Sequence, residues 1–273
     1  MPELVSVVMP CYRAAETLEL AVQGVLQQSH QQLELLLLVD GDEPQTLALA
    51  KQLAATDSRI RLFCSAHNRG VVRARNLGTR LAKGQWLSFC DADDYWLADK
   101  LEQQLAFATK HHANMVCSSF WFWYADRSTQ QTTLARLPKR LHYRLLLQTN
   151  AIPMSTAMYR LDALGKHYFE SLPAPYIHED YAFWLRLLQR NDVKPLCMPV
   201  PTTLIRVLPQ SRSANKWLAM RSHAYILAHV AGLHAFLRIP ALLAYAFWAW
   251  HKRRELPAAA EASKAQLPQF VTR

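Results

Sequence analysis

Two carboxylates stand at i and i+2 in the segment Asp91-Ala92-Asp93-Asp94, directly after an apolar run over residues 86–90. Side chains with this spacing just beyond a strand can turn toward one point, and their hard oxygens suit Mg²⁺ or Mn²⁺. Because Mg²⁺ is usually held by one or two carboxylates together with substrate phosphates, the motif predicts a cation that binds a diphosphate ligand. For this motif alone, a solvated acidic turn that caps the next helix is the alternative.

A second acidic motif, His178-Glu179-Asp180, precedes a helical pattern over residues 181–189. An acid at a helix start often serves only as a cap or as a partner of the helix dipole. Combined with a metal–carboxylate site elsewhere in the chain, it supplies the general base that group transfer to a hydroxyl requires.

A basic motif, Asn68-Arg69-Gly70 followed by Arg73 and Arg75, lies at a predicted helix start. Glycine permits close approach of the backbone, and the arginines can meet phosphates or a base edge; a solvated basic face is the alternative. Neither G-x-G-x-x-G nor G-x-x-x-x-G-K-[ST] occurs in the sequence. Their absence counts against dinucleotide redox chemistry and P-loop chemistry.

The elements that must position these residues alternate over the first 120 residues. Periodicity predicts strands at 4–9, 33–39, 60–63, 86–90 and 115–119, separated by helices at 16–28, 44–55, 70–82 and 97–112. This alternation is typical of right-handed parallel β-α-β units, hence of an α/β fold with helices on both faces of a mostly parallel sheet. Ligands bind at the carboxyl ends of such strands, where residues 10–13, 40–43 and 91–96 leave the sheet.

Taken together, these motifs resemble family 2 glycosyltransferases with the GT-A fold. The matching string, over about residues 4–190, is Val5-Ser6-Val7-Val8-Met9-Pro10-Cys11-Tyr12, residues 36–40, Asn68-x-Gly70, Ala74-Arg75-Asn76-x-Gly78, residues 89–96 and Glu179-Asp180-x-x-x-Trp184-Leu185. Two further pieces, Asn150-x-Ile152-x-x-Ser155-Thr156 and Ser213-x-Asn215-Lys216, are similar to the bacterial branch that builds teichuronic acid, capsule and lipopolysaccharide sugars.

The resemblance implies transfer of a sugar from a nucleotide-sugar donor, with a UDP-sugar favoured, to a hydroxyl of a saccharide or a lipid-linked saccharide. It implies that Pro10, Tyr12 and Asp40 line the nucleotide pocket, with Asp40 facing the base. It further implies that Arg75 helps to hold the nucleotide.

The resemblance also implies a chemical role for three acids. Asp91 and Asp93 form the D-x-D motif, with Asp93 as the direct ligand of Mg²⁺ or Mn²⁺ and Asp91 nearer to the ribose and the metal. Asp180 is the base that deprotonates the acceptor hydroxyl, which gives inversion at the anomeric carbon. The expected class is therefore a metal-dependent inverting glycosyltransferase of cell-surface polysaccharide synthesis.

Two other functions remain as alternatives. A sugar-phosphate nucleotidyltransferase shares a similar sheet and need for metal, but it usually carries a glycine-rich phosphate loop after its first strand, where Pro10-Cys11-Tyr12-Arg13 stands. A non-catalytic, membrane-associated scaffold that retains the fold predicts loss of the acids, whereas Asp40, Asp91, Asp93 and Asp180 are all present.

Composition bounds the organisation of the chain. The 273 residues are 51% hydrophobic and 19% charged, which suits a packed globular protein. The five cysteines form no C-x-x-C pair and the first residues lack a secretory pattern, so a reducing cytoplasm is expected. We predict a glycosyltransferase domain over residues 1–219, with a nucleotide-sugar half over 1–120 and an acceptor half over 121–219. A helical extension over 220–255 and a disordered tail over 256–273 follow.

The net charge of +10 is confined to the last third of the chain. Residues 1–180 hold 18 acidic and 18 basic residues, whereas residues 181–273 hold 3 acidic and 13 basic ones. The excess accompanies an apolar stretch over 222–250 that ends with Trp248 and Trp250 beside Lys252-Arg253-Arg254. This pattern favours an anionic membrane surface over nucleic acid, with peripheral binding at the inner face of the cytoplasmic membrane. A core-packed helix, a spanning helix and a solvated basic face are the alternatives.

Overall fold

The computed structural model describes residues 3–124, 131–207 and 215–255, with the backbone alone for residue 131 and residues 248–255. The predicted motif residue Ser213 and the predicted tail 256–273 lie outside these ranges. The strands are β1 (Val5–Cys11), β2 (Leu33–Asp40), β3 (Ile60–Ser65), β4 (Trp86–Phe89), β5 (Tyr95–Trp96), β6 (Met115–Tyr124), β7 (Gln131–Ala135), β8 (Ala157–Arg160) and β9 (Pro195–Arg206). The helices are α1 (Leu18–Leu26), α2 (Pro44–Thr56), α3 (Val71–Leu81), α4 (Lys100–His111), α5 (Tyr143–Leu146), the 3₁₀ turn η1 (Met154–Thr156), α6 (Leu161–Leu164), α7 (Glu179–Leu188), α8 (Lys216–His229) and α9 (Ala235–Glu255).

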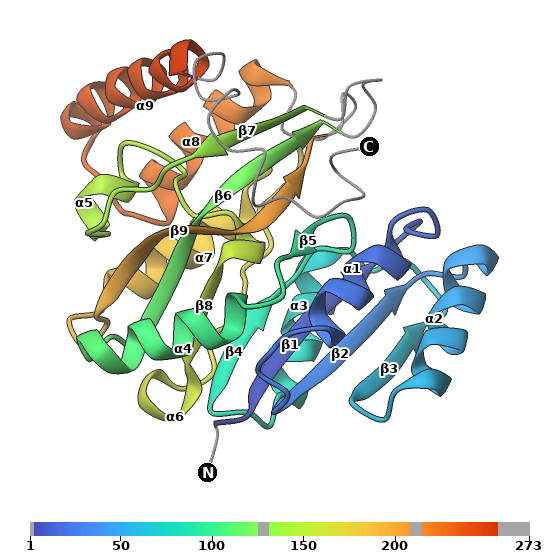
Figure 1. Ribbon diagram of the computed structural model, residues 1–273. Coiled ribbons are helices and arrows are strands. Elements are labelled where there is room, and N and C mark those ends of the chain that lie inside the picture. The colour runs from blue at the N-terminus through green and yellow to red at the C-terminus, as the bar shows by residue number, and fades with distance from the viewer. Residues whose placement is uncertain (1–2, 125–130, 208–214, 256–273) are drawn as a thin grey trace.

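One curved sheet joins the described strands in the order β3-β2-β1-β4-β8-β6-β9-β5, with β7 paired to β6 (Figure 1). Strands β3, β2, β1 and β4 run parallel, as the alternating sequence predicts. Strand β8 then pairs antiparallel to both β4 and β6, and this extends the sheet into the second half of the chain. The carboxyl ends of β1, β2 and β4 consequently share one edge of the sheet, where the acidic segments emerge.

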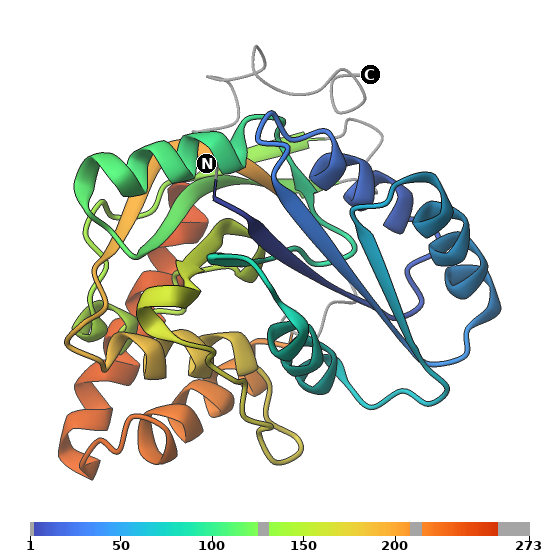
Figure 2. The same cartoon turned by 90° about the horizontal axis from the view of Figure 1, so that it is seen from below.

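Strand β2 is buried on both faces, which accounts for its nearly continuous run of leucines. Leu35 and Leu37 pack in a cluster with residues of α1, α2 and α4, whereas Leu36 and Leu38 pack in the cluster that contains residues of α3 and α7. The two sets of helices cover opposite faces of the sheet (Figure 2). This is the layered arrangement that the sequence predicts.

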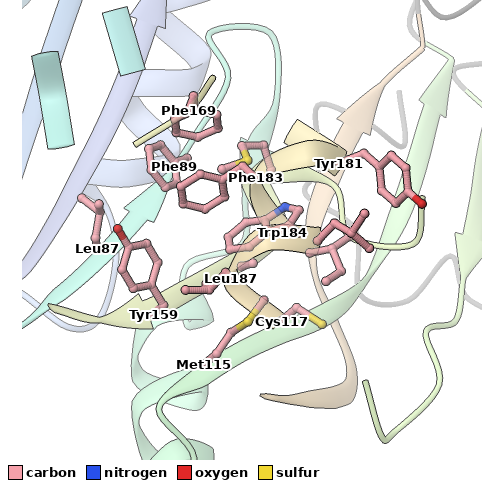
Figure 3. Packing of buried hydrophobic residues seen from close by; sticks show 14 of the residues in the cluster. Leu87, Phe89, Met115, Cys117, Tyr159, Phe169, Tyr181, Phe183, Trp184 and Leu187 are labelled. Atoms are coloured by element: carbon pink, nitrogen blue, oxygen red, sulfur yellow. The ribbon is translucent and has the colours of Figure 1, made fainter. Parts of the chain in front are cut away.

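An aromatic cluster joins the two halves of the chain. Phe89 of β4 contacts Phe169 edge-on, with ring centroids 5.3 Å apart, and Phe169 stacks on Phe183 of α7 at 4.1 Å. Trp184 and Tyr159 extend the same cluster across the middle of the sheet (Figure 3). Aromatic residues about 90 positions apart in the sequence therefore belong to one core.

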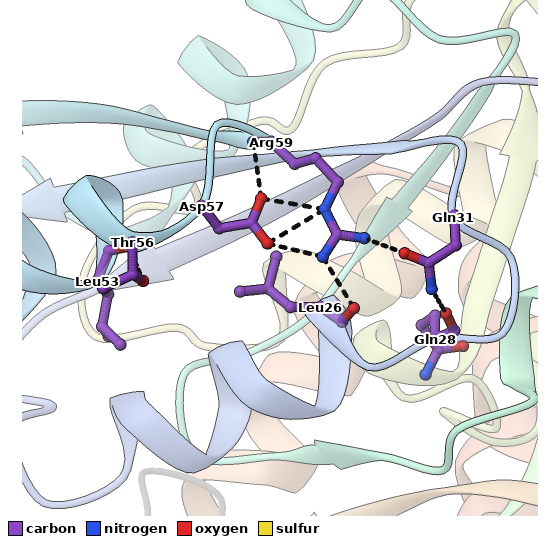
Figure 4. A network of polar contacts seen from close by, with 7 residues as sticks. All are labelled: Leu26, Gln28, Gln31, Leu53, Thr56, Asp57 and Arg59. Carbon is purple, nitrogen blue, oxygen red and sulfur yellow. Dashed lines mark hydrogen bonds and ion pairs between the residues drawn. The ribbon is translucent and has the colours of Figure 1, made fainter.

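A polar network fixes the opposite end of the parallel strands (Figure 4). Arg59, just before β3, donates from Nε and Nη2 to the Asp57 carboxylate and from Nη2 to the Leu26 carbonyl at 3.0 Å. Its Nη1 donates to Gln31 at 2.8 Å. The guanidinium thus ties the turn before β3 to the end of α1 and the loop before β2.

The apolar stretch 222–250 forms parts of two helices rather than one. Helices α8 and α9 are separated at residues 230–234, where Gly232 has a φ of +65°. His223 of α8 is buried and lies between two rings, with Tyr181 of α7 at 4.9 Å and Tyr245 of α9 at 4.0 Å. None of the helices in the described ranges combines the length and apolarity that a membrane span needs.

All the strands and helices predicted over residues 1–120 are present. The short or irregular strands β5, β7, β8 and β9 are additional to the prediction. Helix α7 begins at Glu179, two residues earlier than predicted, so Asp180 lies in its first turn rather than in the preceding loop. The proposed domain boundaries stay a prediction, and α8 runs through the expected limit at residue 219.

Candidate active site

The carboxyl ends of β1, β2 and β4 open into a cleft of about 910 Å³. Its lining includes six residues that the sequence assigned to the donor and the metal, namely Pro10, Tyr12, Asp40, Arg75, Asp91 and Asp93. These residues come from segments up to 83 positions apart, and the parallel sheet brings them together. Asp180 does not belong to this lining.

Asp40 is held by the loop before α3. Its two carboxylate oxygens accept hydrogen bonds from the backbone N–H groups of Arg69 at 2.9 Å and Gly70 at 2.7 Å. Gly70 has a φ of +89°, a conformation that side chains rarely adopt, and it stands directly before α3. The carboxylate therefore has a fixed orientation in the cleft, and it also fixes the start of the helix that carries Arg75.

Tyr12 forms the other wall near Asp40. Its side chain is 46% exposed, and the Arg13 guanidinium lies 5.2 Å from the centre of its ring. Gly41 leaves room for the ring, because a Cβ there would lie 3.3 Å from Tyr12 Cε2. Tyr12 thus supplies an aromatic side chain to the cleft that Asp40 and Gly70 also line.

The acidic turn after β4 is organised by Ser155. Its hydroxyl accepts a hydrogen bond from the Asp91 N–H at 3.0 Å and donates to the buried Asp94 carboxylate, which also accepts from the Arg206 N–H at 3.0 Å. Burial and the neighbouring Asp93 raise the pKa of Asp94 well above its usual range. Asp94 is therefore a supporting residue of the turn, and Asp91 and Asp93 are the pair that faces the cleft.

Asp91 and Asp93 fit a divalent cation by the chemistry of their oxygens and by their crowding. Burial, with the nearby Asp91 carboxylate, raises the pKa of Asp93 to about 6, although Arg206 and Arg75 act in the opposite direction. No group of three His, Cys, Asp or Glu side chains within the described ranges is arranged around one metal position. A cation at this pair would therefore depend on further ligands, such as the phosphate oxygens of a bound diphosphate.

Arg75 connects this turn to the second acidic motif. It is 5% exposed, and its Nη2 lies 2.7 Å from Asp91 Oδ1 while its Nη1 lies 3.8 Å from Glu179 Oε1. Burial opposes the charge of this guanidinium, but Asp91, Glu179 and Asp180 favour it and keep the pKa of Arg75 above its ordinary value. Its Nε has no hydrogen-bond partner in the described part of the chain.

Asp180 lies in the first turn of α7, beside this network. Its Oδ1 accepts a hydrogen bond from the Tyr181 N–H at 2.8 Å. Burial raises the pKa of Asp180 and favours a proton on the carboxyl, whereas His178 and Arg75 act in the opposite direction. A carboxyl with a raised pKa suits proton transfer, and Arg75, which acts on this one, lines the cleft.

Sequence reasoning missed the parts that Glu179, Ser155 and Arg206 play here. Arg206 lines the cleft from the end of β9, and its Nε has no hydrogen-bond partner among the described residues. A signal existed for two of them, because Glu179 and Ser155 lie inside motifs that the sequence displays. Arg206 is the last residue of an irregular strand with no clear periodicity, so nothing in the sequence marked it.

The chain has a parallel β-α-β half with acids at its strand ends. Antiparallel strands join it to a half that presents an acid at a helix start, and this is the architecture of the GT-A class of glycosyltransferases. The sequence comparison agrees, since residues 6–168 match the Glycosyl transferase family 2 profile. The chain belongs to glycosyltransferase family 2, as the sequence motifs predict.

Bacterial relatives cover most of the chain. The UDP-Glc:alpha-D-GlcNAc-diphosphoundecaprenol beta-1,3-glucosyltransferase WfaP of Escherichia coli is 29% identical over 89% of this chain and 93% of its own length. The putative teichuronic acid biosynthesis glycosyltransferase TuaG of Bacillus subtilis is 30% identical over 85% of this chain and 90% of its own. The predicted resemblance to this bacterial branch is confirmed.

Solved structures confirm the fold. S. aureus TarS in complex with UDP superposes with a TM-score of 0.64 at 18% identity, and covers 98% of this chain and 78% of the TarS chain. The mannosyltransferase PcManGT of Pyrobaculum calidifontis, in complex with GDP-Man and Mn²⁺, gives 0.66 at 17% identity over 95% of this chain and 74% of its own.

Proposed function

We propose that this glycosyltransferase is an inverting, metal-dependent enzyme that moves a sugar from a nucleotide-sugar donor to a hydroxyl of a saccharide or lipid-linked saccharide. The observation that carries the proposal is the shared cleft, which collects Pro10, Tyr12, Asp40, Arg75, Asp91 and Asp93. The buried Arg75 bridges this set to the helix of Asp180.

In the proposed donor site, Tyr12 stacks against the base, and Asp40 and Pro10 shape the base pocket. The unpartnered Nε atoms of Arg75 and Arg206 support an anionic ligand, because a buried donor without an acceptor is costly and a phosphate oxygen would satisfy it. We favour UDP as the nucleotide, the carrier named for WfaP.

Asp91 and Asp93 would hold Mg²⁺ or Mn²⁺, which would supply Lewis-acid stabilisation of the charge on the departing nucleoside diphosphate. Asp180 takes the proton from the acceptor hydroxyl as that oxygen attacks the anomeric carbon and the bond to the diphosphate breaks. Attack from the face opposite the leaving group inverts the anomeric configuration. Arg75 orients Asp91, and its guanidinium places positive charge beside the leaving phosphate.

We further propose a place for the reaction in cell-surface polysaccharide synthesis, at the inner face of the cytoplasmic membrane. Two similarities support this: WfaP is named for a diphosphoundecaprenol acceptor and TuaG for teichuronic acid synthesis. The basic last third of the chain, with Trp248 and Trp250 beside its basic cluster, suits a membrane surface better than nucleic acid, so we propose no nucleic-acid partner.

A panel of nucleotide sugars tests the proposal directly. The purified protein with Mn²⁺ and a mixture of short lipid-linked saccharides should release nucleoside diphosphate from one donor far faster than from the others. Chelation should abolish release, and added Mn²⁺ should restore it. Full release in excess chelator, or no release from any donor, would contradict the proposed reaction.

A further inference from the structure

Helix α9 carries an exposed apolar stripe. Phe236 is 71% exposed, Ile239 64% and Leu243 66%, and Pro240 between them is also exposed. Positions 236, 239, 240 and 243 fall on one face of a helix, because they are separated by three, four and seven residues. We name these four residues the α9 stripe. Large aliphatic and aromatic side chains at this exposure on one face normally mark a contact surface.

The opposite face of α9 packs against the protein. Tyr245 stacks on the buried His223 of α8, and Arg238 donates from Nε to the Leu233 carbonyl at 2.7 Å. Helices α8 and α9 lie side by side along one end of the molecule (Figure 1). The helix is therefore apolar outward and anchored inward, which is the arrangement of a helix lying in a membrane interface rather than across it.

Charge identifies the surface that covers the stripe. From residue 216 to residue 254 the sequence contains no Asp or Glu, and it contains Lys216, Arg221, Arg238, Lys252, Arg253 and Arg254. A second copy of this chain would bring the same uncompensated positive charge to the contact. An anionic bilayer offers acyl chains to the stripe and phosphates to the basic residues other than Arg238, which faces inward.

We infer that α9 docks the enzyme on an anionic lipid bilayer, with the α9 stripe inserted below the headgroups and the helix axis along the surface. The inference deepens the proposed function by naming the surface that meets the membrane, and it rests on that function only for the lipid-linked acceptor. The ring ladder Tyr181–His223–Tyr245 joins the docked helix to the residue next to Asp180. Docking therefore holds the candidate base at the membrane side of the molecule.

Flotation of the full chain with vesicles tests this placement. The wild-type protein should float with phosphatidylcholine–phosphatidylglycerol vesicles and not with phosphatidylcholine alone. The double variant Ile239→Gln/Leu243→Gln should lose about tenfold or more in vesicle partitioning, because two inserted aliphatic side chains are removed. Leu77→Gln/Val200→Gln is the matched control, since these side chains are 40% and 42% exposed and belong to α3 and β9. It should float like the wild type.

A second measurement keeps the test independent of the stability of the Gln variant. In a Cys64→Ser background, which removes the exposed native thiol, an environment-sensitive dye on Leu243→Cys should shift to the blue with anionic vesicles. The same dye on Val200→Cys should not shift. The inference would be overturned if the wild type did not float, or if the stripe variant floated as well as the wild type. It would also be overturned if the stripe variant lost a dimer of the protein instead of its binding to vesicles. These assays contain no donor, so failure of the proposed transfer reaction leaves their outcome unchanged.

Discussion

Arg75 is the residue on which the charge balance of the site depends. Its buried guanidinium contacts Asp91 at 2.7 Å and Glu179 at 3.8 Å, so one cation serves two acids from opposite halves of the chain. Such an arrangement contributes little net stability, because burying charges costs about as much as their attraction returns. Its value is geometric, since it fixes Asp91 relative to the helix that carries Asp180.

Replacing Asp93 tests the metal at the residue scale. Asp93→Asn should lower turnover by about 10²-fold or more, since a bound cation provides several kcal/mol of charge stabilisation. It should not lower the melting temperature, because burial and Asp91 already disfavour the ionised Asp93 carboxylate. Wild-type protein should gain thermal stability from Mn²⁺ with nucleoside diphosphate, and the variant should not. Asp99→Asn, at an exposed acid, is the control; an unchanged Mn²⁺ response in Asp93→Asn would contradict metal binding there.

Replacing Asp180 separates donor binding from proton transfer. Asp180→Asn should bind the donor with unchanged affinity by calorimetry, since its side chain is outside the cleft lining, yet lose about 10²–10⁴-fold in transfer. The wild-type product should show the inverted anomeric configuration by NMR. Asp162→Asn, at an exposed first-turn acid of α6, is the comparison. Lost donor binding in Asp180→Asn, or a retained configuration, would count against the assigned base.

At the scale of elements, the contact of α3 with β1 places Arg75. Gly78 lies so close to the sheet that a Cβ there would approach Val8 Cγ1 to 2.4 Å. Gly78→Ala should therefore lower the free energy of unfolding by about 1–3 kcal/mol through overpacking, and should reduce activity by displacing the helix. In the Gly78→Ala background, Val8→Ala should cost less than it does alone, as a double-mutant cycle in urea would measure. Additive costs would show that the two residues are not in steric conflict.

The buried lysine of α4 predicts a pH dependence of stability. Lys100 donates to Gln104 at 2.6 Å and lies 3.9 Å from the centre of the Trp96 ring, and burial lowers its pKa from 10.5 to about 7. Between these pH values the unfolded chain binds a proton on this group that the folded chain lacks. The contribution of Lys100 to the free energy of unfolding therefore rises with pH across this window, by about 1.4 kcal/mol per pH unit, and is flat below it.

Urea unfolding at a series of pH values would measure this contribution as the difference in free energy of unfolding between the wild type and Lys100→Met. In this difference the contributions of the titrating cysteines and tyrosines cancel. The difference should grow as pH rises. Lys110→Met, at an exposed lysine of the same helix, should run parallel to the wild type. Parallel curves for Lys100→Met as well would mean that Lys100 keeps its ordinary pKa in the folded protein.

At the scale of the whole molecule, the sequence predicts the parallel half well and the rest in outline. Strands such as β2 are long apolar runs, so the local sequence pattern is enough to predict that they are buried strands. Strands β8 and β9 owe their pairing to partners far along the chain, and β9 contains three prolines, so no local pattern marks them. Motifs in the sequence marked five cleft residues at strand ends and Arg75 of α3, whereas nothing local marked Arg206.

The cluster of Phe89, Phe169 and Phe183 has a consequence for synthesis on the ribosome. A nascent chain that has emerged only to residue 120 already holds β4, but neither β8, which covers its free edge, nor the rings that cover Phe89. An open strand edge beside bare aromatic surface is a template for aggregation. The first half should therefore be insoluble when expressed alone, and the interval between translation of residues 90 and 183 is the period in which this protein most depends on chaperones.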